Sequence, residues 1–179
     1  MTPSFNSNAS SAILGVVVRD NNGFILGAQC VVSYHVASSF ATEAQPAIHG
    51  LNFASDLGFQ WVEVEGDSRA VVTKLLSASS DTSEISALIG EAKGLARNFR
   101  DCKFVFRNCG GNVVAHSLAH LRGELATDTI WVEEAPWQIE LLAAEDRRFP
   151  PKPRKGDEFN SELVEILSGE AKVVDVELG

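Results

Sequence analysis

Cysteine is scarce in this sequence, and its cysteines follow no metal-binding pattern. Cys30, Cys102 and Cys109 are odd in number and lack the spacing of zinc ligands. This argues against a disulfide framework and favours reduced thiols in a cytosol or nucleus. The alternative is that all three cysteines only fill space in strands and loops and have no chemical role. We therefore expect an intracellular protein, either cytoplasmic or nuclear.

Long apolar runs are missing as well. No run approaches the roughly 20 residues that a membrane-spanning helix needs, so we expect no membrane contact. Residues 1–6 show neither the basic nor the apolar region of a secretory signal. The 179 residues suit one domain with a tail, large enough to bury a core without disulfides or a structural metal. The oligomeric state stays open.

Positive charge is in the minority. The chain has 15 Lys and Arg residues against 24 Asp and Glu, a formal net charge of −9. Proteins that bind nucleic acid tightly usually neutralise phosphates with Lys and Arg, so the composition argues against a high-affinity binder. A local basic patch or a metal-bridged contact stays open. Four basic residues are candidate phosphate contacts, with solubility as the alternative: Lys93, Arg97, Arg107 and Arg122.

The N-terminal part predicts a β-hairpin followed by a helix. Two strands, Ala12–Asp20 and Phe24–Val32, flank Asn21-Asn22-Gly23, and Asn and Gly tolerate the positive φ of a tight turn. Ser38 or Ser39 then caps a helix that runs to about Leu57, with Gly58 after its end. Pro46 predicts a kink or a late start of that helix.

The stretch Trp61–Ser68 predicts a strand with a carboxylate just after its end. Valines at 62 and 64 alternate with glutamates at 63 and 65, which is the pattern of a half-buried strand. Gly66 ends the strand, and Asp67-Ser68 opens a helical pattern. Asp67 thus stands at the carboxyl end of a strand, where α/β folds place ligands and metal ions.

The rest of the chain predicts alternating helices and strands, and then a tail. The expected elements are a helix over Glu84–Phe99, a strand over Lys103–Arg107, a helical stretch over Val113–Leu121 and an aromatic C-terminal segment over Thr129–Leu142. From Pro150 the composition shifts to prolines and charge, which is typical of a linker. We expect a domain over residues 1–146, and a linker and poorly ordered tail over 147–179. The element order predicts an α/β domain with a mixed sheet covered by helices.

The order and spacing of these elements resemble the ribonuclease H-like superfamily, specifically the plant reverse-transcriptase-like RNase H type-1 domains. The resemblance covers about residues 3–146. It is carried by Gly15–Gly23, Thr42–Ala44, Val62–Ser68, Arg107 and Asn112–Ala119, followed by Trp131, Pro136-Trp137 and Leu141-Leu142. It implies a mixed five-stranded sheet flanked by helices. The first strand is truncated or missing here.

The resemblance also implies a chemistry, namely hydrolysis of the RNA strand of an RNA–DNA hybrid with Mg²⁺ or Mn²⁺. Two divalent ions about 4 Å apart activate a water and stabilise the leaving oxygen. Family carboxylates come from the first strand, the first helix, the central strand and the last helix, and oxygen is the ligand that Mg²⁺ requires.

The implied site residues are incomplete in this chain. Glu43 matches the helix carboxylate and Asp67 the central-strand aspartate, so these two are the expected metal ligands. Thr2 stands at roughly the first-strand position, and His116 stands at the last-helix position. The expected catalytic set is therefore Glu43, Asp67 and His116. Two of four acidic positions are missing, which predicts weakened hydrolysis.

Each of these residues also has a plain structural interpretation. Asp67 is a possible N-cap of the next helix, and Glu43 a solvated helix carboxylate. His116 is a possible packing or capping residue. His116 and His120 have the i, i+4 spacing of zinc-binding helices, but no accompanying Glu completes that motif. Glu65 precedes the end of its strand and is a poor substitute ligand.

Three functions stay open on the sequence. The first is an active RNA–DNA hybrid ribonuclease, which needs a further carboxylate, for example from a start upstream of Met1. The second is a nucleic-acid-binding domain of the same fold with little or no activity, descended from a retroelement. The third is a protein-interaction scaffold, which the acidic composition suits. Fold alone does not decide among them.

Overall fold

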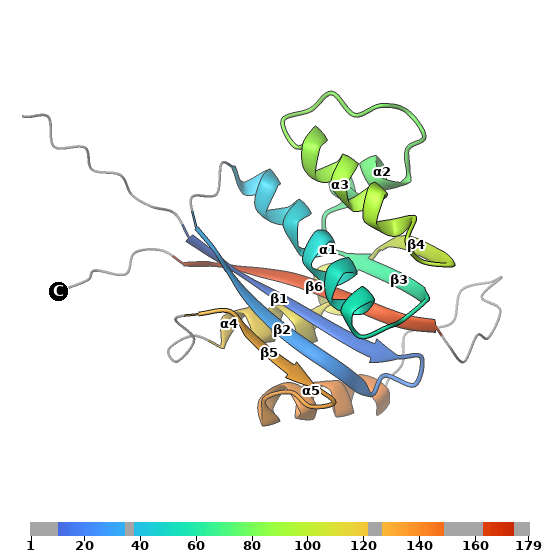
Figure 1. Ribbon diagram of the computed structural model, residues 1–179. Helices are drawn as coiled ribbons and strands as arrows, with labels where there is room; N and C mark the ends of the chain where they lie inside the picture. Colours follow the sequence, from blue (N-terminus) through green and yellow to red (C-terminus); the bar gives the residue numbers. More distant parts are fainter. Residues whose placement is uncertain (1–10, 35–37, 122–126, 149–162, 174–179) are drawn as a thin grey trace, which may run out of the picture.

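A mixed sheet forms the centre of the molecule, with helices on both of its faces (Figure 1). The computed structural model describes residues 11–34, 38–121, 127–148 and 163–173. Within these ranges the sheet has six strands in the order β4-β3-β6-β1-β2-β5, and five α-helices flank it. The expected α/β class is confirmed, and the sheet has one strand more than expected.

The predicted hairpin is present as β1 (Ser11–Asp20) and β2 (Ile25–Ser33), which pair antiparallel. The Asp20 carboxylate accepts bonds from the backbone N–H groups of Asn22 and Phe24, both at 2.9 Å. Gly23 has a φ of +81°, which a residue with a side chain rarely adopts. The turn is therefore formed by residues within it, namely the Asp20 carboxylate and the glycine at position 23, as the sequence predicts.

Helix α1 (Ser39–Asp56) crosses one face of the sheet. The Ser38 side chain accepts a bond from the Ala41 N–H and caps the helix, as predicted. The helix continues through the buried Pro46, so it does not start late. It leads into β3 (Trp61–Gly66) and then into α2 (Arg69–Leu76).

The remaining helices complete two layers around the sheet. Next come α3 (Ser86–Ala96), β4 (Asp101–Phe106), a 3-10 turn (Cys109–Gly111), α4 (Val113–His120), β5 (Thr129–Val132) and α5 (Trp137–Arg148). One apolar core joins α1, α2 and α3 to β1, β3 and β6, and a second joins α4 and α5 to β1 and β2. None of the described helices is long and apolar enough to cross a membrane.

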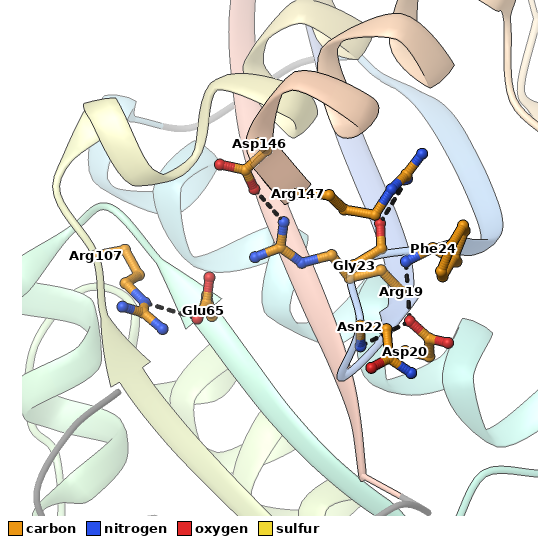
Figure 2. A network of polar contacts seen from close by, with 9 residues as sticks. All are labelled: Arg19, Asp20, Asn22, Gly23, Phe24, Glu65, Arg107, Asp146 and Arg147. Atoms are coloured by element: carbon orange, nitrogen blue, oxygen red, sulfur yellow. Dashed lines mark hydrogen bonds and ion pairs between the residues drawn. The ribbon is translucent and has the colours of Figure 1, made fainter. Parts of the chain in front are cut away.

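Helix α5 is fastened to the hairpin by two arginines (Figure 2). The buried Arg19 of β1 forms an ion pair with Asp146, and Arg147 donates a hydrogen bond to the Gly23 carbonyl at 3.0 Å. The Arg147 guanidinium also lies 4.4 Å from the centre of the Phe24 ring. The C-terminal helix is thus held against the start of the domain.

The strand β6 (Leu163–Val173) lies in the middle of the sheet. It runs parallel to β3 and antiparallel to β1, so it separates the two strands that would otherwise be nearest neighbours in the sheet. We expected a poorly ordered tail over 147–179, and the structure differs at residues 163–173 because both neighbours offer a free edge there. Thr2 and the proposed linker lie outside the described residues, and the domain boundary at 146 stays a prediction.

Candidate active site at the carboxyl end of β3

Asp67 and His116 meet just beyond the end of β3. The Asp67 Oδ2 lies 3.3 Å from the Nε2 of His116, which projects from the first turn of α4. Their side chains are 25% and 31% exposed, so both reach solvent. When His116 is protonated this contact becomes an ion pair. His116 therefore contacts the candidate aspartate, and does not serve only as packing for α4.

Glu43 is joined to the same place through Ser68. The Ser68 hydroxyl donates a 2.7 Å hydrogen bond to Glu43 Oε2, which comes from the second turn of α1. Ser68 is also the N-cap of α2, accepting a bond from the Val71 N–H at 3.4 Å. The alternative that Asp67 caps α2 is therefore wrong, and its carboxylate is left for His116.

The pocket next to Glu43 is too small for a substrate. Its volume is about 10 Å³, and Gly66 and Ser68 form part of its wall. A space of that size holds about one water molecule. A nucleic acid therefore cannot enter this pocket.

Glu65 has a different partner and a different environment. Its Oε1 accepts a 2.7 Å hydrogen bond from Arg107 Nε, and its side chain is 1% exposed (Figure 2). Removing either partner of such a buried ion pair is costly, so the pair helps to hold Arg107 beside the end of β3, where β3 and β4 also pair in parallel. Glu65 is thus a structural carboxylate, in line with its weak candidacy as a ligand.

The described residues fit a two-ion centre poorly. Within that part of the chain, no three His, Cys, Asp or Glu side chains are grouped so as to hold a metal ion. Glu43 and Asp67 lie at the end of β3, and each already has a partner, Ser68 or His116. Mg²⁺ is often bound by one or two carboxylates together with substrate phosphates, so this pair fits one weakly held ion.

The basic residues near the site are few. Arg69, at the start of α2, lies with its guanidinium 4.4 Å from the centre of the Phe106 ring at the end of β4. Arg107 is next to Phe106 and is held by Glu65. Lys93 donates to the Ser77 carbonyl at 2.6 Å, and Arg122 lies outside the described residues. Among the described residues, Arg69 and Arg107 therefore flank the ends of β3 and β4.

His120 neighbours His116 on α4, and among the described residues it makes no hydrogen bond or ion pair with Asp67 or Glu43. It is exposed, and its Nδ1 lies 2.7 Å from the backbone carbonyl oxygen of His116. The two imidazole rings are 5.8 Å apart at an interplanar angle of 68°. The His120 ring therefore contacts the backbone of its own helix, whereas the His116 ring contacts Asp67.

The sequence predicted three of the residues that meet here and missed two. Glu43, Asp67 and His116 come together from α1, the end of β3 and α4, and their roles stay predictions. The bridging role of Ser68 was missed, although its place directly after Asp67 at a helix start was a usable signal. The Arg69–Phe106 contact was also missed, because it joins residues 37 positions apart in the sequence with no local pattern.

Comparisons with known proteins agree with this architecture. Residues 2–122 match the family described as reverse transcriptase-like. RNase H1 from the halophilic archaeon Halobacterium salinarum NRC-1 is 26% identical, with a TM-score of 0.56, and the match covers 64% of this chain and 86% of that one. The N-terminal RNase H domain of Rv2228c from Mycobacterium tuberculosis is 20% identical, with a TM-score of 0.45 and coverage of 75% and 96%. No curated protein matches the chain.

Proposed function

Because this chain belongs to the reverse transcriptase-like family, we propose that it binds RNA–DNA hybrid at the carboxyl end of β3 and hydrolyses the RNA strand weakly. The similar archaeal structure is an RNase H1, and the fold around the site is shared with it. The observation that carries the proposal is that Glu43 contacts Ser68 at 2.7 Å while His116 contacts the preceding residue, Asp67, at 3.3 Å, both at the end of β3.

Each of the three residues has a role that follows from its contacts. Glu43 and Asp67 supply the oxygen atoms that would face one Mg²⁺ or Mn²⁺ ion. A bound divalent ion would supply positive charge for a phosphate oxygen at this edge. His116, in contact with Asp67, holds or gives up a proton beside that phosphate. Ser68 orients Glu43 and is a positioning residue.

Weak hydrolysis follows from the small number of carboxylates. Two negative side chains neutralise one dication and leave a second ion without counter-charge. His116 brings no negative charge, and neutral imidazole suits Mg²⁺ poorly. We therefore propose a domain whose main activity is binding, with cleavage far slower than in a site that holds two ions.

Two arginines support binding to phosphates. Arg69 contacts the Phe106 ring and Arg107 is the residue after Phe106, which pairs with Gly66 at the end of β3. Phosphate contacts from arginine make affinity depend on salt, with a slope set by the number of contacts. A net charge of −9 keeps that number low, so we expect moderate affinity.

The test is fluorescence anisotropy with a labelled RNA–DNA hybrid, measured with Mg²⁺ and with EDTA over a range of salt. We expect binding that weakens with salt and strengthens about tenfold with Mg²⁺, since a metal-bridged phosphate contact adds to the charge interactions. Asp67→Asn should lose the Mg²⁺-dependent part. Asp56→Asn, the same change at the exposed far end of α1, should keep it.

The competing function is a protein-interaction scaffold, which the net charge of −9 favours. It predicts that the folded protein shows no salt-dependent affinity for hybrid, duplex DNA or single-stranded RNA. That result would overturn the proposal. We also propose an intracellular location, since Cys30 and Cys102 are free thiols.

A further inference from the structure

The strand β5 forms one edge of the sheet, far across it from the candidate active site (Figure 1). It pairs antiparallel with β2, from Gly27 opposite Val132 to Cys30 opposite Thr129. Among the described strands, β6, β1 and β2 lie between β3 and β5. Neighbouring strands are about 4.8 Å apart, so β5 lies about 19 Å from β3. A ligand bound along β5 therefore uses a different surface from one bound at Asp67.

The backbone groups of Ile130 and Val132 point away from β2. The Glu133 N–H donates a 2.9 Å hydrogen bond to the Leu26 carbonyl, which makes this a hydrogen-bonded pair of the two strands. In an antiparallel pair, such positions alternate with positions whose N–H and C=O groups face outward. Counting back from Glu133, the next bonded position is Trp131, and the outward positions are Ile130 and Val132. β5 thus presents the N–H and C=O groups of both residues along its outer edge.

The side chains of these two residues are exposed as well, at 56% for Ile130 and 54% for Val132. Trp131 packs on the core beneath α4 and α5, so its neighbours in the strand point to the other face, which α1 covers. Helix α1 reaches only as far as β2, where Phe53 lies against Gly27. Exposed β-branched side chains beside outward backbone groups are a template for an added strand.

Acidic residues stand at both ends of this edge. Asp128 precedes β5, and Glu133 and Glu134 follow it, all three exposed. A second copy of the chain, paired antiparallel, would set Ile130 opposite Val132. The same register would set Asp128 of one copy opposite Glu134 of the other, and like charges placed opposite each other destabilise strand pairs. The acidic ends therefore disfavour a second copy and favour a strand with basic residues on both sides.

We propose that β5 is a docking edge for an extended segment of another protein, with two β-branched residues at alternate positions and Lys or Arg at both ends. The segment adds antiparallel to β5 as a further strand of the sheet. Its two β-branched residues exchange backbone hydrogen bonds with Ile130 and Val132, and their side chains lie on the same face as those of β5. Its basic ends lie against Asp128 and Glu134. This function is separate from binding of the hybrid at β3.

The probe is a fluorescein-labelled peptide of sequence KKTVTVTKK, and its binding to the full chain is followed by fluorescence anisotropy. Methylation of the two valine backbone nitrogens removes the N–H groups that face β5, and should weaken binding at least about tenfold because main-chain bonds supply much of the affinity of an added strand. Methylation of the last two threonine nitrogens removes N–H groups that face away from β5. That peptide should bind within about twofold of the parent peptide.

A pair of protein variants locates the binding site. Ile130→Lys should weaken binding of the parent peptide at least about tenfold, since it removes an apolar contact and repels the basic ends. Leu76→Lys makes the same charge change at a 64% exposed position at the end of α2, and should change the affinity less than about twofold.

Equal affinities of the two methylated peptides would overturn the proposal, and this comparison holds even if Ile130→Lys does not fold. Equal affinities of the two protein variants, both folded by circular dichroism, would also overturn it. So would the absence of parent-peptide binding at about 1 mM. A dimer of the chain in analytical ultracentrifugation that Ile130→Lys dissociates would show that a second copy occupies β5, which contradicts a basic partner.

Discussion

Ile166→Ala is the substitution that most directly tests whether β6 belongs to the core. Ile166 is fully buried in the middle of the sheet, between β1 and β3 and under α1. The change removes three carbon atoms, worth about 2.4 kcal/mol at about 0.8 kcal/mol for each buried CH₂ group. The cavity left behind adds to this, and buried Ile→Ala changes cost about 2–5 kcal/mol. We expect a loss of about 3.5 kcal/mol in the free energy of unfolding.

Urea unfolding followed by circular dichroism measures that loss. With a urea dependence of about 2 kcal/mol per molar, the midpoint should fall by about 1.7 M. The control is Ile130→Ala on β5, where the side chain is 56% exposed and the same change should cost under about 1 kcal/mol. If Ile166→Ala leaves too little folded protein, Ile166→Val should still cost about 0.5–1.5 kcal/mol. Equal midpoints for both alanine variants would mean that β6 is not in the sheet.

Three further predictions concern packing, capping and thiol reactivity. Gly50→Ala should destabilise the fold by about 1–3 kcal/mol through overlap with Ile166 Cγ2, and by less in the Ile166→Ala background, as a double-mutant cycle in urea would measure. Ser68→Ala should cost about 1 kcal/mol in the same assay by removing the α2 cap and the bond to Glu43, whereas Ser68→Thr should keep most of it. Burial raises the pKa of Cys30 to about 11 and of Cys102 to about 12, so both thiols stay protonated at pH 8. Iodoacetamide at pH 8 should therefore label them much faster in urea than in the native protein, and equal rates by mass spectrometry would contradict this.

Local patterns predicted the elements whose causes are local. The hairpin needs only Asn22 and Gly23 in its turn and alternating strand residues, and α1 needs Ser38 at its start. Asp67 was placed at the end of β3 by the same kind of reasoning. The hairpin turn and the helix cap are formed by residues close in sequence, and the alternation of residues in β3 is also a local pattern, which is why the sequence alone was enough.

Non-local contacts decided the parts that the sequence did not predict. We expected the segment 163–173 to be part of a poorly ordered tail, and its Gly169 and several charged residues are unfavourable in a strand. It becomes a strand because β1 and β3 offer backbone partners on both sides. A non-local contact also involves the α2 cap. Ser68, not Asp67, caps α2, and the Ser68 hydroxyl donates a hydrogen bond to Glu43 on another helix.

The most direct test of the central claim is a time course of labelled RNA–DNA hybrid with Mg²⁺ and then Mn²⁺, comparing the wild-type chain with Asp67→Asn. Both proteins should first be shown to be folded, and the wild type to bind the hybrid. We predict binding by the wild type and only slow cleavage, at least about 100-fold slower than that of a two-ion RNase H1 assayed alongside, because two carboxylates hold at most one ion. Asp67→Asn should abolish what cleavage remains. Cleavage as fast as that reference enzyme, or cleavage that is unchanged in Asp67→Asn, would contradict the account.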